Sequence, residues 1–242
     1  MSTTTQIERP DYGIDAPGVV RSLTAGGVVS LLAAVASSWS GVAWAAIGLA
    51  LVAVVLLMEA ALMLHNSWRG KFQHRDRILD HVSWRGDERV LDVGTGRGLL
   101  LVGAAKRLTS GHAIGMDIWS TKDLSGNAME RTAANLVAEG VASRCELVTE
   151  PAQNMTFAAG SFDVILSNLC LHNIRSASER VRACMDIARV LKPGGVAVIS
   201  DLFFTRRYAE TFRAVGLSIS IDGPCVWSVF PPQNIVIARK LK

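Results

Sequence analysis

Hydrophobic positions are concentrated in one stretch near the start of the chain. From Ser22 to Leu64 the only charged residue is Glu59. The second part of this stretch, residues 42–64, is 23 residues long. At about 1.5 Å per residue, a helix of that length spans a hydrocarbon core of about 30 Å. We therefore predict a membrane-spanning helix there.

The 18 residues from 22 to 39 are also apolar, but they include several Gly, Ser and Thr and are marginal as a span. Ser, Trp and Gly between the two parts predict a short turn. Trp39 and Trp44 flank that turn and Trp68 lies beyond the other end, as aromatic residues do at two membrane interfaces. The pattern predicts a transmembrane helical hairpin over residues 22–64.

Several details of the hairpin stay open at this stage. Small residues at positions 25–27 permit close helix contact, either within the hairpin or between chains, so an oligomer is allowed and not decided. Glu59 is either a functional acid within the span or a side chain that reaches the headgroups. Buried helices of a soluble protein are the competing interpretation, although 23 residues with one acid is long for a core helix. A cleaved signal peptide is disfavoured because the first 20 residues lack a basic segment.

Basic residues follow the hairpin directly, at Arg69, Lys71, Arg75 and Arg77. This excess of positive charge is typical of a cytoplasmic flank. We therefore expect a membrane protein with two spans, with both ends of the hairpin and the rest of the chain in the cytoplasm.

Beyond the hairpin, short apolar runs alternate with segments of helical periodicity. A basic amphipathic helix is expected over residues 66–80. Strands are predicted at 89–93, 113–116, 145–149, 163–167, 196–200, 217–222 and 234–238, and helices at 99–108, 127–139, 176–191 and 205–215. Ser176 with Glu179 predicts a capping box, and the Pro-Gly-Gly at 193–195 predicts a break. This alternation indicates an α/β fold with a mainly parallel sheet covered on both faces.

The predicted organisation has four parts. Residues 1–21 are an N-terminal tail, 22–64 the transmembrane hairpin, 65–84 a juxtamembrane basic helix and 85–242 a globular α/β domain. In such a domain, ligands bind at the carboxyl ends of the parallel strands.

Composition and charge narrow the class further. Half of the residues are hydrophobic, which excludes a disordered protein. The four cysteines are far apart and form no CxxC pair, so neither a disulfide framework nor a metal site is expected. The chain has a net charge of +4, and residues 66–242 alone carry +6. That charge suits an anionic membrane surface. No basic run with interleaved aromatics points to nucleic acid.

A glycine loop follows the first predicted strand, in the sequence Asp92-Val-Gly-Thr-Gly-Arg-Gly98. Glycine at every second position allows a tight turn and close approach of a ligand. The next strand ends at Asp117, 21 residues after Gly96. A carboxylate there can accept both hydroxyls of a ribose. The third glycine comes one residue too early for the dinucleotide pattern G-x-G-x-x-G, which disfavours a nicotinamide dinucleotide.

Four motifs in order carry a family resemblance: the glycine loop, Gly-Met-Asp at 115–117, Ser-Phe-Asp-Val-Ile-Leu-Ser at 161–167 and Arg-Val-Leu-Lys-Pro-Gly-Gly at 189–195. Together they resemble the class I S-adenosylmethionine-dependent methyltransferases, in the small-molecule branch that includes the ubiquinone/menaquinone C-methyltransferases. The resemblance covers about residues 66–242. It implies an enzyme that uses S-adenosylmethionine, and a Rossmann-like sheet of seven strands, the last antiparallel, with helices on both faces.

The resemblance also implies a role for each matching position. The methionine part of the cofactor would lie over Gly94, Thr95, Gly96 and Gly98, with Asp92 orienting that loop. Asp117 would hold the ribose hydroxyls. Adenine would be lined by Ile118 and Trp119, and the methionine side by Ser167 and Asn168.

The chain departs from the family pattern at the end of the third strand. Pro151 stands where the family usually has an acid, and proline has no N–H to offer adenine. Glu150 would then accept from the adenine amino group, or it is a solvated acid on a loop. The sequence leaves these two interpretations open.

Methyl transfer from a sulfonium needs mainly alignment and exclusion of water, although oxygen and carbon acceptors often need a base. His172 follows the fourth strand and is the candidate base, with Asn173 beside it as a further substrate contact. Alternatively, His172 only shapes its loop or contacts the cofactor. Asp201, at the end of the fifth strand, is a second candidate that would more simply cap a helix or orient a loop.

The sequence therefore predicts a membrane-anchored methyltransferase acting on a small, lipophilic acceptor or lipid. Two alternatives remain: an enzyme for a soluble small molecule or protein that is merely tethered to the membrane, and a non-catalytic scaffold that binds the cofactor. The acceptor and the methylated atom do not follow from the sequence.

Overall fold

The computed structural model describes residues 9–121, 124, 126–225 and 229–242. It divides into two compact units. Residues 13–71 form one, which we call the hairpin unit. The other, the globular unit, combines the chain up to Tyr12 with residues 72–242. The hairpin unit is thus an insertion in the sequence of the globular unit.

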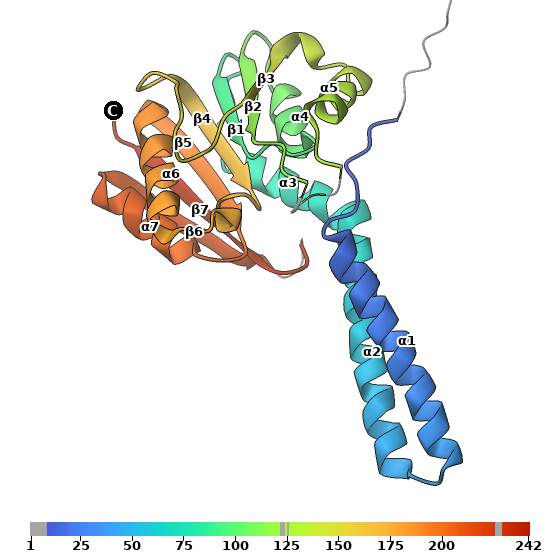
Figure 1. Cartoon of the computed structure of the whole chain (residues 1–242). Helices are drawn as coiled ribbons and strands as arrows, with labels where there is room; N and C mark the ends of the chain where they lie inside the picture. Colours follow the sequence, from blue (N-terminus) through green and yellow to red (C-terminus); the bar gives the residue numbers. More distant parts are fainter. Residues whose placement is uncertain (1–8, 122–123, 125, 226–228) are drawn as a thin grey trace, which may run out of the picture. The chain divides into compact units, whose positions relative to one another are not determined.

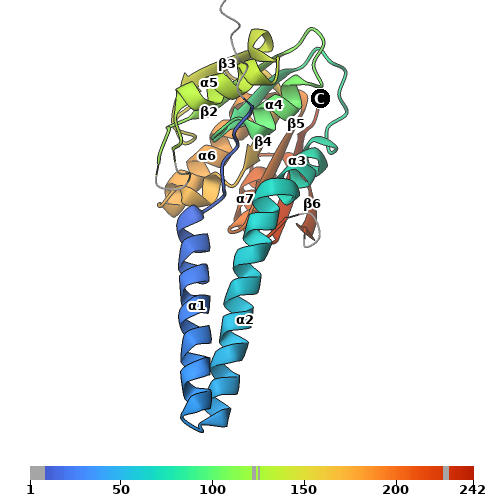
Figure 2. The same cartoon turned by 90° about the vertical axis from the view of Figure 1, so that its right-hand side faces the viewer.

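Two long helices make up the hairpin unit, α1 (Pro17–Trp39) and α2 (Ala43–His65), each of 23 residues. They lie side by side and antiparallel (Figure 2). Helix α1 begins five residues before the predicted start, because Pro17 suits the first turn of a helix and the charged Arg21 is accommodated by bonding to the Pro17 carbonyl. At 23 residues, the first helix is as long as the second.

Small residues of α1 face α2 within the same chain. A Cβ added to Gly27 would lie 2.7 Å from Leu57 Cγ, and one added to Gly26 would lie 3.3 Å from Leu56 Cδ1. Of the two uses left open for these glycines, close packing within the hairpin is therefore the one that the structure has.

The outer surface of the hairpin unit is apolar. Both helices are long and apolar enough to cross a membrane, and only 17% of the most apolar stretch of each is buried. Helices in the core of a soluble protein would be mostly buried. Trp39 and Trp44 beside the turn are exposed, as is Trp68 towards the other end.

Hydrogen bonds join the segment before α1 to the segment after α2, at the end of the hairpin opposite its turn. Here α2 continues into a π-helical turn, η1 (Asn66–Gly70). The Asp15 backbone N–H donates to Ser67 Oγ at 3.0 Å, Asn66 donates to the Asp15 carboxylate, and Lys71 donates to the Gly13 carbonyl at 2.6 Å. The predicted helix over 66–80 is confirmed as this turn followed by α3 (Lys71–Leu79).

The globular unit contains a seven-stranded sheet of order β3-β2-β1-β4-β5-β7-β6. Its strands are β1 (Arg89–Val93), β2 (His112–Asp117), β3 (Cys145–Thr149), β4 (Phe162–Asn168), β5 (Leu191–Asp201), β6 (Leu217–Cys225) and β7 (Gln233–Lys240). Strand β7 runs antiparallel to both of its neighbours, β5 and β6, whereas the other pairs of neighbouring strands are parallel. The predicted fold is confirmed, including the direction of the last strand.

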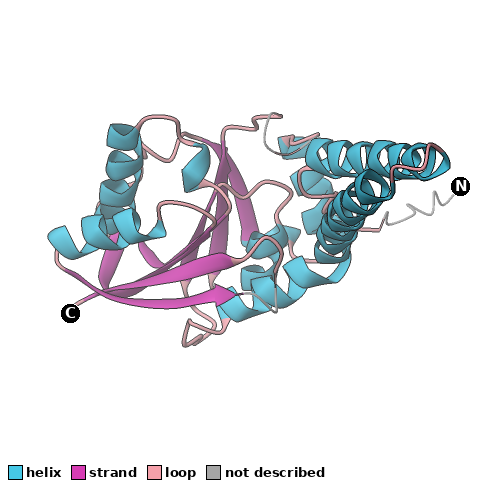
Figure 3. Cartoon of the chain, turned by 90° about the horizontal axis from the view of Figure 1, so that it is seen from below, coloured by secondary structure: helices cyan, strands magenta, loops and turns pink. Residues whose placement is uncertain are grey.

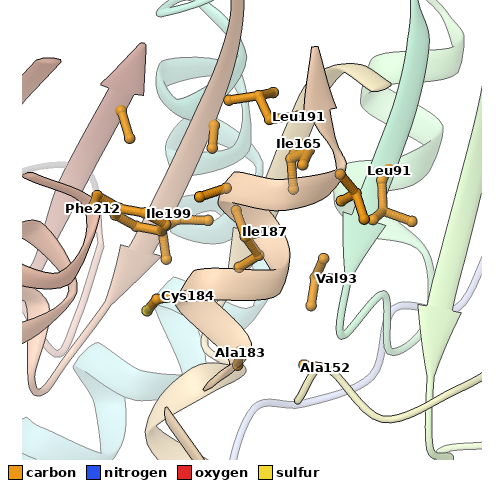
Figure 4. Packing of buried hydrophobic residues seen from close by; sticks show 14 of the residues in the cluster. Leu91, Val93, Ala152, Ile165, Ala183, Cys184, Ile187, Leu191, Ile199 and Phe212 are labelled. Carbon is orange, nitrogen blue, oxygen red and sulfur yellow. The ribbon is translucent and has the colours of Figure 1, made fainter. Parts of the chain in front are cut away.

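Helices cover both faces of this sheet (Figures 1 and 3). They are α4 (Leu99–Ala105), α5 (Met129–Ala138), α6 (Ala177–Val190) and α7 (Thr205–Ala214), together with the 3-10 turns η2 (Ala142–Arg144) and η3 (Leu171–Asn173). Successive strand residues point to opposite faces, which gives two cores. Leu91 and Ile165 pack with Ile187 of α6 and Phe212 of α7 (Figure 4), whereas Leu166 belongs to the core that α3, α4 and α5 share.

Two local predictions were wrong. Helix α6 ends at Val190, within one residue of the predicted end, but β5 begins at Leu191, earlier than predicted, and includes the Pro-Gly-Gly at 193–195. The irregular register opposite β4 absorbs this segment, as in a bulge. Helix α6 does follow Ser176, but the capping box is absent, since the Ser176 hydroxyl bonds Ser178 Oγ at 2.7 Å.

Candidate functional site

The glycine loop connects β1 to α4 at the carboxyl edge of the sheet. Gly94, Gly96 and Gly98 have φ values of 75°, 52° and 81°, a region that favours glycine. The N–H of Gly94 donates to the Met116 carbonyl at 2.7 Å. A Cβ on Gly94 would collide with the side chain of Cys170, so glycine is required at this position.

Asp92 lies directly below the loop, where it is 1% exposed. Its Oδ2 accepts a hydrogen bond from the Thr95 hydroxyl at 2.8 Å. Burial raises the pKa of Asp92 to about 7, and the nearby Asp117 carboxylate acts in the same direction. Asp92, predicted to orient the glycine loop, thus contacts that loop through Thr95.

Asp117 ends β2 and reaches back to the glycine loop. Its Oδ2 accepts the Gly96 backbone N–H at 2.8 Å, and its Oδ1 accepts the backbone N–H of Trp119 at 2.7 Å. Asn127 donates to the same Oδ1 at 3.3 Å. Beside it, Ile118 is exposed. The carboxylate thus joins the loop after β1 to the loop after β2.

Three other residues predicted to contact the cofactor lie near the ends of β2, β3 and β4, and their side chains bond within the protein. The Trp119 indole N–H donates to Thr149 Oγ1 at 2.7 Å at the end of β3. Glu150 follows β3, and its carboxylate accepts the backbone N–H of Thr156 at 3.0 Å, so it is bonded within its own loop. After β4, Ser167 is buried and donates to the Val93 carbonyl at 2.9 Å.

Asn168 carries a buried side-chain oxygen, Oδ1, that has no hydrogen-bond partner among the described residues. The same is true of Oδ1 of Asn127. Buried polar atoms are nearly always paired, so each of these is an acceptor available to a ligand group.

His172 and Asp201 are paired, although they are 29 residues apart. His172 Nδ1 lies 2.5 Å from Asp201 Oδ1, and the His172 backbone N–H donates to Asp201 Oδ2 at 3.1 Å. Asp201 is fully buried, and it also accepts from the Leu202 N–H at 2.8 Å and the Tyr208 hydroxyl at 3.2 Å. A carboxylate only accepts, which assigns the proton to Nδ1 and leaves the Nε2 lone pair available.

Tyr208 was not predicted, because its role depends on α7 packing against the end of β5, which no local pattern reveals. Asn173, predicted beside His172, is exposed, and its amide lies 3.4 Å from the Leu169 carbonyl.

Two exposed aromatic residues lie beside this pair, in the connection between β5 and α7. The ring of Phe203 is 59% exposed and lies 6.1 Å from the His172 ring, and Phe204 follows it. Phe204, Trp119 and Leu169 have positive φ values, and they come just after β5, β2 and β4 respectively. Strained backbone of this kind concentrates at functional sites, and here it gathers at one edge of the sheet.

Part of the globular unit matches a known family. Residues 91–199 match the family described as "Methyltransferase domain". A ribosomal protein L11 methyltransferase of Syntrophotalea carbinolica is 34% identical over 117 residues, which are 48% of this chain and 33% of that protein. A ubiquinone/menaquinone biosynthesis C-methyltransferase of Geotalea daltonii is 32% identical over 145 residues, 60% of this chain and 55% of that protein. The chain thus spans only about a third to a half of these relatives.

Solved structures share the fold at lower identity. A SAM-dependent methyltransferase from Aquifex aeolicus has a TM-score of 0.55 and 16% identity, covering 68% of this chain and 88% of that one. The [4+2]-cyclase SpnF has a TM-score of 0.58 and 18% identity, covering 70% of this chain and 81% of that one. Because a cyclase shares it, the fold alone does not specify the reaction.

Proposed function

We propose that the chain is a class I, S-adenosylmethionine-dependent methyltransferase, built around the methyltransferase domain at residues 91–199, and that it methylates a small, lipophilic acceptor at a membrane. The cofactor is the methyl donor.

The side chains at the carboxyl edge fit this cofactor. The glycines of the loop carry no side chain that would keep a ligand from the backbone, and the Asp117 carboxylate at the end of β2 could accept further hydrogen bonds from hydroxyl groups. The unpartnered Oδ1 of Asn168 suits an ammonium group. When bound, S-adenosylmethionine supplies a methyl group carried on a positively charged sulfur. The chain's residues would hold it and exclude water while the acceptor is aligned.

His172 would act as the general base. Its Nε2 would take the proton from an accepting oxygen or carbon while Asp201 stabilises the charged ring. The proton would then pass to water. The observation that carries this proposal is the position of the His172 loop beside the glycine loop: Cys170, two residues before His172, packs against Gly94. A base and a cofactor loop in such proximity can serve one transfer.

The hairpin supports a lipophilic acceptor. Its exposed apolar helices need a non-aqueous environment, so we infer that it anchors the chain and that the globular unit is cytoplasmic. Within the globular unit, both points where the hairpin is inserted lie near the carboxyl edge. Tyr12 adjoins Asp11, which bonds Arg97 of the glycine loop, and His74, two residues after Phe72, bonds Ser200 of β5. The chain therefore leaves the globular unit for the hairpin, and returns from it, within a few residues of side chains at the carboxyl edge.

The test is transfer of a tritiated methyl group from S-adenosylmethionine to fractionated membranes and cytosol. We expect label in the lipid extract of the membranes, and its loss with Asp117→Ala. Label only in soluble metabolites would refute the lipophilic acceptor. Label in protein would favour the second candidate, a protein methyltransferase, which the ribosomal protein L11 methyltransferase relative suggests. Cofactor binding without any transfer would leave the scaffold or a different reaction.

A further inference from the structure

A short strap, residues 9–12, precedes the hairpin in sequence and crosses the globular unit beside the glycine loop. The Asp11 N–H donates to Asn135 Oδ1 at 2.8 Å, and Asn135 Nδ2 donates back to the Asp11 carbonyl at 3.0 Å. The amide of Asn135, on α5, therefore pairs with the backbone of the strap on both sides, much as a neighbouring strand would.

A second connection runs from the strap to the glycine loop itself. Arg97 stands between Gly96 and Gly98, and its Nη1 donates to Asp11 Oδ2 at 2.7 Å. The Arg97 side chain is only 9% exposed, so its charge depends on acceptors supplied by the protein. Asn135 also donates to the Arg97 carbonyl at 2.9 Å. One helix residue thus holds both the strap and the loop.

The network continues to the ribose-binding candidate. The Thr132 hydroxyl of α5 donates to the Gly96 carbonyl at 2.6 Å, while the Gly96 N–H donates to Asp117. Gly96 is therefore fixed on both sides, and Arg97 is the next residue along the chain. A shift of the Arg97 side chain would be transmitted directly to this backbone.

Tyr12 secures the strap at its other end. Its ring is buried and packs edge-on against Phe72, with 5.7 Å between ring centroids. Its hydroxyl donates to Glu139 at 2.9 Å, at the end of α5. The strap is thus held at two adjacent residues by separate sets of side chains, which allows one set to be perturbed without the other.

We propose that Asp11 is a positioning residue for the cofactor loop, acting through Arg97. Its carboxylate fixes the guanidinium, and this keeps the backbone of residues 96–98 in the conformation that binds S-adenosylmethionine. Cofactor affinity then depends on a segment that precedes the first hydrophobic helix. By linkage, cofactor binding stabilises docking of the strap to the same degree. This inference rests on the proposed cofactor site.

The experiment measures the dissociation constant of S-adenosylmethionine for the full chain in detergent micelles by calorimetry. We expect Asp11→Ala to weaken binding about tenfold, in the ordinary range for coupled sites. Turnover at saturating cofactor should stay within about twofold of wild type, and hydrogen exchange at residues 94–98 should speed up. Asp11→Glu should restore much of the affinity. Asp87→Ala, at an exposed carboxylate, is the matched control.

A double-mutant cycle with Arg97→Ala tests the route. If Asp11 acts through Arg97, Asp11→Ala should have little further effect in the Arg97→Ala background. Equal weakening in both backgrounds, or an unchanged dissociation constant in Asp11→Ala, would overturn the inference. Failure of the wild-type chain to bind S-adenosylmethionine would instead refute the proposed cofactor site, so the two failures are distinguishable.

Discussion

Asp201→Asn is the sharpest test of the proposed base. The carboxylate faces four donors, two at each oxygen. Oδ1 accepts from His172 Nδ1 and the Leu202 N–H, and Oδ2 accepts from the His172 backbone N–H and the Tyr208 hydroxyl. Asparagine keeps one acceptor oxygen but places an NH₂ group against the other pair of donors. A rotation of the amide cannot relieve this, because a backbone N–H belongs to each pair.

The magnitude follows from that count. In either orientation, one buried backbone N–H loses its acceptor, which costs about 1–3 kcal/mol of stability. With NH₂ towards His172 Nδ1, the imidazole would also change tautomer, since Nδ1 must then accept. Nε2 would carry the proton and could no longer act as a base. With the amide oxygen towards Nδ1 the tautomer is kept, but the negative charge that would stabilise the protonated ring is lost. General-base catalysis contributes about 10²- to 10⁴-fold, so we expect turnover to fall in either orientation, and by that full range where the tautomer changes.

The assay is methyl transfer at saturating S-adenosylmethionine, with the cofactor dissociation constant and the melting temperature measured on the same preparation. Turnover should collapse, cofactor affinity should change little and melting should fall by a few degrees. Asp87→Asn, at an exposed carboxylate, should leave all three unchanged. Turnover of Asp201→Asn within about threefold of wild type would show that His172 does not act as the base through this pair.

Three further predictions concern other parts of the chain. Gly94→Ala should weaken cofactor binding and lower stability by about 1–3 kcal/mol, since the new methyl group meets the side chain packed there at φ 75°; unchanged calorimetry would contradict this. Burial lowers the pKa of His74 from 6.5 to about 4, so between these pH values the unfolded chain takes up a proton that the folded chain does not. The free energy of unfolding should therefore decrease as the pH falls from 6.5 towards 4, by up to about 3 kcal/mol. His74→Gln should flatten this part of the stability profile in denaturant titrations, and an unchanged acid loss would argue against it. Gly27→Leu should loosen the hairpin by about 1–3 kcal/mol through collision with Leu57, seen as a lower melting temperature, whereas Gly48→Leu, with open space around it, should not; equal effects would refute the packing.

Much of the fold could be predicted because its signals are local. Strands β1 and β3 match their predicted bounds, since polar and turn residues flank their apolar runs. The start of α1 was missed because Arg21 interrupts the apolar pattern, although a helix tolerates a charge near its end. Pro-Gly-Gly at 193–195 was misread because a bulged register, not a local rule, accommodates it.

Parts of the candidate site could be predicted from local sequence, and other parts could not. The glycine loop and Asp117 follow strands and could be found from the sequence. The pairing of His172 with Asp201 could not, because it requires β4 and β5 to be neighbours and joins a residue of the 3-10 turn after β4 to the last residue of β5. The strap had no signal at all, since nothing in the residues around Asp11 indicates Asn135 as a partner.

The strap also links the cofactor site to the way the chain is made. Asp11 and Asn135 are 124 residues apart, and both apolar helices lie between them. During synthesis Asp11 emerges before the hairpin, and the hairpin emerges before α5. The strap can therefore dock to Asn135 only after both hairpin helices have been synthesised. If the helices enter the membrane as we propose, insertion of only one of them would leave Asp11 on the opposite side from α5. Asp11 could then not form its ion pair with Arg97, and a molecule with the wrong membrane topology would lack this contact at the cofactor loop. The ion pair between Asp11 and Arg97 would thus form only in molecules with the correct topology, and cofactor binding would depend on that topology.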